Sequence, residues 1–105
     1  MAPATPHHYV VLRADLPVGT ALAMCCHAAG ESGPADPGTI AVVLEVADEA
    51  ALLDLFRKLD EGAEHCPHLI NEPDEPHFGA AMALGFLTPH GKSKAVKHLR
   101  LWRQK

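Results

Sequence analysis

The sequence predicts an α/β fold with three layers (α/β/α), in which helices cover both faces of a mixed four-stranded sheet. Apolar strand-like runs alternate with helix-like segments in the order β-α-β-α-β-β-α, and only a loop separates the last two strands. Strands separated by helices form parallel βαβ units, whereas strands joined by a short loop pair antiparallel. Sites in such sheets gather at the carboxyl ends of the strands, so the loops after Leu16 and Asn71 are the expected rims.

Four segments have the composition of strands. The apolar run in residues 39–46 is nearly continuous, as expected at the centre of a covered sheet, and residues 8–16 contain a similar run. Residues 64–71 predict a short strand, in which Pro67 indicates an edge or an irregular start. Residues 80–87 predict the last strand and complete the sheet.

Three segments favour helices. Good helix formers in residues 21–29 predict the first helix, with Thr20 as its N-cap. Asp48 is the expected N-cap of the second helix and Gly62 its stop. A short basic helix is expected from about Ser93. The second helix carries an apolar stripe at helical spacing, formed by Leu52, Leu55, Phe56 and Leu59.

The length, the N-terminus and the cysteines limit the class of protein. The 105 residues suit one domain, expected over 8–105, and residues 1–7 are expected to be a disordered leader. The leader lacks the pattern of a signal peptide, and no stretch approaches the ~20 apolar residues that span a bilayer. Three cysteines, two of them adjacent, indicate reduced thiols and a cytoplasmic protein.

Charge is divided along the chain. The net charge is −4, yet all 13 acidic residues lie at or before Glu75, and residues 91–105 carry six basic residues and no acidic one. A solvated basic surface is the simpler interpretation of this pattern. The functional interpretation is a polyanionic partner.

The stretch MCCHAAGES, residues 24–32, suggests either a metal site or a nucleophile with its base. In a helix, however, Cys25 and His27 would point about 200° apart, which disfavours both. Zinc spacings such as C-x₂-C are absent, so no metal is expected and the cysteines are predicted to be packing residues. His27 can be structural or catalytic on local context alone. The side chains that could supply metal ligands are Cys25, Cys26, His27, His65, Cys66 and His68.

Several segments together carry the motifs of one known family. They are YVVLRADL, then GTALAMCCHAA, then VVLEV with the helix that follows it, and later NEPDEP and KAVKHLRLW. Over His8–Trp102 the chain resembles the type 2 peptidyl-tRNA hydrolases of archaea and eukaryotes, above all the divergent peptidyl-tRNA hydrolase domain-containing branch. The resemblance implies an α/β/α fold, a homodimer, tRNA binding, and hydrolysis of the ester between peptide and tRNA without a cofactor.

The resemblance also implies site residues. His27 matches the helix histidine of the family, Arg13 and Asp15 match its strand-end pair, and Glu72 falls where typical members place a catalytic aspartate. His27, Glu72 and Asp15 are therefore the expected catalytic residues. Glu72 would position water or accept its proton, and His27 would orient the ester or stabilise charge. The expected substrate-binding residues are Arg13, Thr20, Asp74, Lys92, Lys94 and Lys97.

The chain departs from the family pattern at several of these positions. Thr20 stands where typical members have a lysine, and Met24 replaces a glutamine. Two prolines replace the expected threonine in the loop after Glu72, and Asp74 and Glu75 add negative charge there. These changes weaken the attraction for tRNA phosphates. An inactive module that binds tRNA or a protein on the same fold is therefore the alternative to an active hydrolase.

Overall fold

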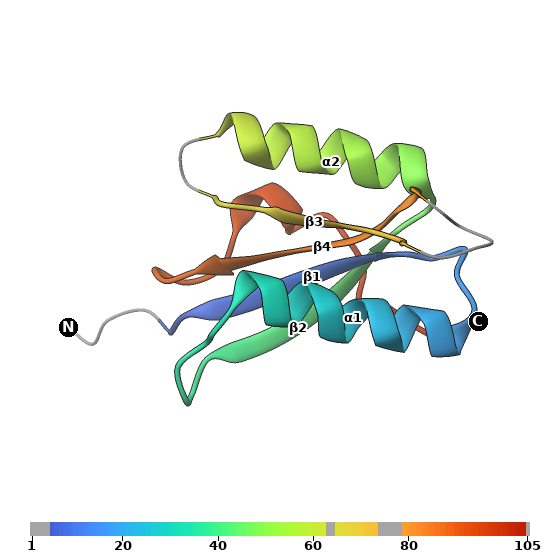
Figure 1. Ribbon diagram of the computed structural model, residues 1–105. Helices are drawn as coiled ribbons and strands as arrows, with labels where there is room; N and C mark the ends of the chain where they lie inside the picture. Colours follow the sequence, from blue (N-terminus) through green and yellow to red (C-terminus); the bar gives the residue numbers. More distant parts are fainter. Residues whose placement is uncertain (1–4, 63–64, 74–78, 105) are drawn as a thin grey trace.

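The computed structural model describes residues 5–62, 65–73 and 79–104 and has the expected three-layer α/β/α architecture (Figure 1). Its elements are β1 (His7–Arg13), α1 (Val18–Ser32), β2 (Ile40–Val46), α2 (Glu49–Glu61), β3 (His68–Asn71), β4 (Ala81–Thr88) and the 3-10 turn η1 (Lys94–Val96). The sheet order is β2-β1-β4-β3. β1 and β2 are parallel, and β4 is antiparallel to both β1 and β3, so the sheet is mixed as predicted.

Each face of the sheet carries its own apolar core under one helix. Tyr9 and Val11 of β1 face α2, where they pack in a cluster with Leu52 and Phe86. Val10, on the opposite side of the strand, faces α1. Because both faces are covered, β1 and β4 are buried along nearly their whole length, which is why they appear in the sequence as continuous apolar runs.

The second helix follows the sequence prediction closely. Ala51 N donates to Asp48 Oδ1 at 3.0 Å, which is the expected N-cap, and Gly62 follows the last helical residue. Three of the four residues in its predicted apolar stripe are buried, and Phe56 is partly buried against the same core.

The first helix begins earlier than the sequence suggests. Pro17 occupies its N-cap position, and no side chain caps it. Pro17 has a φ of −59° and a ψ of 150°, so it is still extended, and the helical conformation begins at Val18. Thr20 is therefore the third residue of α1, and its assignment as the N-cap is wrong. The helix continues to Ser32, three residues beyond the predicted stretch.

The expected C-terminal helix is replaced by a single turn and an extended tail. After η1, Leu101 forms an antiparallel bridge with Leu44 on the outer edge of β2. Arg100 O accepts from Glu45 N at 3.1 Å, and Trp102 N donates to Val43 O at 2.9 Å. The tail thus supplies hydrogen bonds to an edge strand that the rest of the sheet leaves open.

The remaining boundaries differ by a few residues. His7, assigned to the leader, is the first residue of β1, and Pro6 O accepts from Ile40 N. β1 ends at Arg13 rather than Leu16, and β3 begins at His68. Within the described ranges, no helix has both the length and the apolar character needed to cross a membrane.

α1 lies on β4 at backbone contact, and the contact depends on Gly85. A Cβ built on Gly85 would lie 2.6 Å from both Ala28 O and Ser32 Oγ. We therefore expect Gly85→Ala to lower the free energy of unfolding by about 1–3 kcal/mol, because the helix backbone must move away. Urea unfolding measures this change. Gly30→Ala, in the same helix but with no atom within 4 Å, is the matched control and should be neutral or stabilising.

His8 gives the fold a defined pH dependence. Ser32 Oγ donates to Ala28 O at 2.6 Å and accepts from His8 Nε2 at 2.7 Å. Burial lowers the pKa of His8 below its ordinary value of 6.5, so folding favours the neutral ring. The contribution of neutral His8 to the free energy of unfolding is complete above the pKa that the residue has in the unfolded chain. It is lost as the pH falls through the pKa that the residue has in the folded protein.

We therefore expect the wild type to lose more stability than His8→Gln between about pH 8 and about pH 5, because the glutamine amide does not titrate. Urea unfolding across that range is the measurement. His27→Gln, which replaces an exposed histidine of α1, should keep the wild-type pH dependence. Identical slopes for His8→Gln and the wild type would contradict the assignment.

Candidate functional site

A guanidinium at the carboxyl end of β1 joins three elements. Arg13 Nε and Nη2 donate to the two carboxylate oxygens of Asp15 at 2.9 and 2.8 Å, and Nη1 donates to Ala81 O at 3.2 Å. Ala81 N donates in turn to Glu49 Oε2 at 2.7 Å. These bonds with Asp15 raise the pKa of Arg13 above its ordinary value. The predicted strand-end pair is therefore formed, and it links the loop after β1 to the starts of β4 and α2.

Glu72 lies at the same edge of the sheet. It follows the last residue of β3, and its backbone N–H donates to Ala80 O at 2.9 Å while its carbonyl accepts from Gly79 N at 2.8 Å. The Glu72 side chain is half-buried. Since β3 is parallel to β1, their carboxyl ends meet at one edge of the sheet, as predicted for the rim of a site.

Thr20 and His27 share one side of α1. They are seven residues apart, which places them two turns apart along the helix, about 10 Å. Thr20 lies in the first turn, near the carboxyl ends of the strands, and is half-buried, whereas His27 is exposed. The neighbour of His27, Ala28, packs on Gly85.

His27 and Glu72 are consequently well separated. Glu72 is bonded opposite Ala80, and Ala28 lies over Gly85, five residues further along the same chain segment. Five extended residues cover roughly 17 Å. His27 leans back toward the N-terminus of α1, which shortens this gap but does not bring the two groups into direct contact. Any shared role in a reaction must therefore involve different atoms of a substrate.

The predicted phosphate-binding lysines lie elsewhere. Thr88, at the end of β4, pairs with His7 at the start of β1, so Lys92 and Lys94 follow at the opposite end of the sheet from Glu72. Eight residues of β4 correspond to roughly 24 Å. Lys97 is exposed just after η1. Asp74, the remaining predicted site residue, lies outside the described residues.

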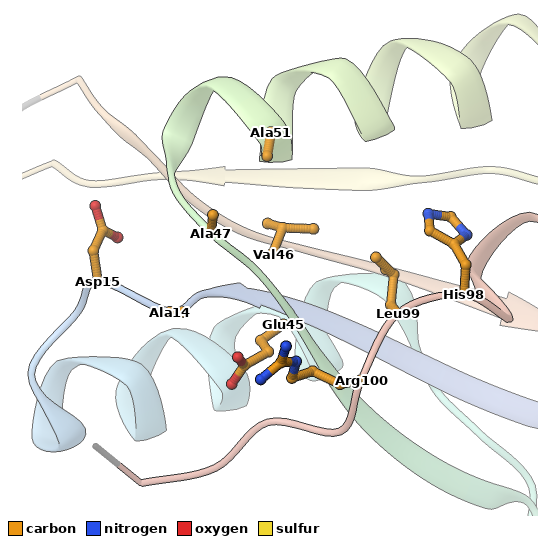
Figure 2. A pocket seen from close by; sticks show the side chains of 9 residues that line it. All are labelled: Ala14, Asp15, Glu45, Val46, Ala47, Ala51, His98, Leu99 and Arg100. Atoms are coloured by element: carbon orange, nitrogen blue, oxygen red, sulfur yellow. The ribbon is translucent and has the colours of Figure 1, made fainter.

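A pocket at the carboxyl-end edge has a volume of about 620 Å³ and lies beside Asp15 (Figure 2). Val46, Ala51 and Leu99 give it apolar walls, and the C-terminal segment closes one side. Buried Glu45 accepts from Arg103 N at 3.2 Å, and in the view its side chain projects in the same direction as that of Arg100. The full lining is Ala14, Asp15, Glu45, Val46, Ala47, Ala51, His98, Leu99 and Arg100.

The cysteines differ from one another in environment. Cys25 packs against the core under α1, and its burial, followed by the neighbouring Cys26, raises the pKa of its thiol. Cys26 and Cys66 are exposed, so the prediction that the paired cysteines are packing residues holds for Cys25 and is wrong for Cys26. Among the residues the structure describes, no three histidine, cysteine or acidic side chains are grouped so that they could hold a metal ion.

The sequence analysis did not identify the pocket residues Glu45, His98 and Arg100. Glu45 is the one acidic residue in an apolar strand, which is a usable signal, but His98 and Arg100 reach the pocket only because the tail runs along β2. Comparison with known proteins adds no assignment, since no protein-family model and no curated protein matches the chain.

Proposed function

We propose that this protein is a peptidyl-tRNA hydrolase-like esterase, which cleaves the ester between a peptide and the 3′ end of a tRNA. The observation that carries the proposal is that Arg13, Asp15 and Glu72 lie at one edge of the sheet. Arg13 holds Asp15 and donates to Ala81 O. The backbone N–H of Glu72 donates to Ala80 O, beside the start of β4. The motif resemblance assigned these three residues to one site, and they come from two segments, the end of β1 and the loop after β3. The three-layer fold that the resemblance implied supports the same proposal.

The width of the edge suits such a substrate. From β2 to β3 the edge covers three inter-strand gaps, roughly 14 Å in all. The 620 Å³ pocket lies at the β2 side and Glu72 at the β3 side. A peptide can lie against the apolar wall of Val46 and Leu99 while its ester reaches toward Glu72.

The reaction adds water to the ester carbonyl and releases the ribose hydroxyl of the terminal nucleotide. In this proposal the carboxylate of Glu72 accepts the proton of the attacking water, and that proton is passed to the departing ribose oxygen. Asp15, fixed at both oxygens by Arg13, orients the substrate, and Arg13 acts through Asp15. His27 approaches from α1 and contacts a different part of the substrate.

Two observations favour a second function, a module on the same fold that binds tRNA or a protein without catalysing hydrolysis. Thr20 stands in the first turn of α1, next to the proposed site, where typical members of the resembled family have a lysine. The strand-end cation, Arg13, is engaged by Asp15 and has only 12% of its side chain exposed. The site therefore presents little positive charge to a developing oxyanion, and hydrolysis depends on donors other than these side chains.

Glu72→Gln tests the hydrolase. We expect it to lower the rate of peptide release from peptidyl-tRNA by about 100-fold or more, because the amide cannot accept the proton of water. His27→Ala should lower the rate by a smaller factor, on the order of 10-fold. The assay is release of labelled peptide by the purified protein in the presence of a chelator.

Glu61→Gln is the control, since Glu61 is exposed at the far end of α2. It should retain the wild-type rate. Wild-type turnover that is unchanged in Glu72→Gln would remove Glu72 from the mechanism. A folded wild type that binds tRNA without releasing peptide would replace the hydrolase with the binding module.

A further inference from the structure

A second pocket, of about 460 Å³, lies at the end of the sheet opposite Glu72. It is formed by the loop between β4 and η1 together with His65, which precedes β3. Its lining residues are His65, Thr88, Pro89, His90, Gly91, Lys92, Ser93, Lys94 and Ala95. This pocket takes no part in the chemical step of the proposed hydrolysis, although Lys92 and Lys94 were expected among the substrate-binding residues.

The loop that forms the pocket is anchored at both ends. Thr88 Oγ1 donates to Gly91 O at 2.6 Å, which closes the turn, and Gly91 adopts a φ of +113° that favours glycine. Ser93 N donates to the hydroxyl of buried Tyr9 at 3.0 Å. Ser93 Oγ lies 3.0 Å from His65 Nε2. The loop is therefore held in shape before any ligand arrives, which lowers the entropy cost of binding.

The imidazole of His65 is itself held in place. It packs edge-on against Phe86, with ring centroids 5.0 Å apart, and Phe86 is fully buried. The His65 ring, which is hydrogen-bonded to Ser93 Oγ, therefore forms a fixed wall on one side of the pocket. The loop between β4 and η1 contributes Lys92 and Lys94 to the lining, and both are exposed.

The ionisable side chains among the described lining residues of this pocket are all basic. Two lysines and two histidines line it, and no carboxylate is among the described residues that do so. Neither Lys92 nor Lys94 forms an ion pair with a carboxylate in the part of the chain that the structure describes. The ammonium groups are therefore available to an anion with several acceptor oxygens, and exposed His90 lies in the same loop.

We propose that this pocket binds a phosphate group, held by Lys92 and Lys94 and bordered by His65 and His90. Phosphate combines concentrated negative charge with acceptor oxygens on all sides, which suits point charges and hydrogen-bond donors that converge from two segments. The volume exceeds that of a lone phosphate and leaves room for part of the molecule that carries it. The site stands apart from the proposed hydrolysis and does not require it.

The test compares the wild type with the double variant Lys92→Ala/Lys94→Ala. The probes are a short labelled single-stranded RNA, followed by fluorescence anisotropy over a range of salt concentrations, and inorganic phosphate as competitor. Loss of two phosphate contacts should reduce the slope of log K against log salt by about 1.4, at about 0.7 for each contact. Arg57→Ala/Lys58→Ala removes two exposed cations from α2, outside the pocket, and should keep the wild-type slope.

The outcomes separate the sources of the phosphate. Lysine-dependent RNA binding that phosphate reverses assigns the pocket to nucleic acid. Lysine-dependent binding of phosphate alone, seen by calorimetry, assigns it to a small phosphorylated ligand. Equal RNA affinity and salt slope in the wild type and the lysine variant, with no lysine-dependent binding of phosphate, would overturn the proposal. Peptide release from an ester that carries only the terminal nucleoside reports on hydrolysis independently, since that substrate has no backbone phosphate.

Discussion

The position of α1 on the sheet depends on one missing side chain. At Gly85 the helix backbone occupies the space of a Cβ, with Ala28 O and Ser32 Oγ both 2.6 Å from that position. Close-packed interiors tolerate no such overlap, so any other residue there would move the helix. Because α1 is one continuous helix of 15 residues, the contact at Ala28 also sets how far Thr20, about two turns away, lies from the sheet. The first turn of the helix therefore reaches the carboxyl ends of the strands, where the polar residues of the proposed site gather.

Arg13 holds the charged and polar groups at that edge of the sheet in place. Its side chain is only 12% exposed, so its charge must be satisfied within the protein. Asp15 supplies both carboxylate oxygens and Ala81 a carbonyl, and this leaves Asp15, with 43% of its side chain exposed, as the member of the pair that a ligand meets. Sequence motifs alone assign Arg13 to the substrate. In the proposed site Arg13 is instead a positioning residue, because it donates to Asp15 and to Ala81 O of its own chain.

Secondary structure could be predicted wherever the signal was local. The cap at Asp48, the buried face of α2 and the mixed sheet follow from propensity and periodicity, which act over a few residues. The C-terminal segment could not, because its conformation depends on a distant partner. Val96 and Leu99 pack with the core beneath α2, whereas Trp102 packs with the core beneath α1, so the tail crosses the open edge of β2 between them. For the same reason the pocket beside Asp15, which this tail closes, left no trace in the motifs.

For the site residues, too, only the contacts between near neighbours in sequence could be predicted. The pairing of Arg13 with Asp15 was predictable, since the residues are two apart, but the separation of Lys92 and Lys94 from Glu72 was not. Roughly 24 Å of β4 lies between them, about three times the Debye length of ~8 Å at physiological ionic strength. Carboxylates at one end therefore barely repel an anion at the other. Asp15 and Glu72 thus offset little of the attraction that Lys92 and Lys94 exert on phosphate, although the chain carries a net charge of −4. An RNA substrate held at both ends would have to span that distance along the molecule.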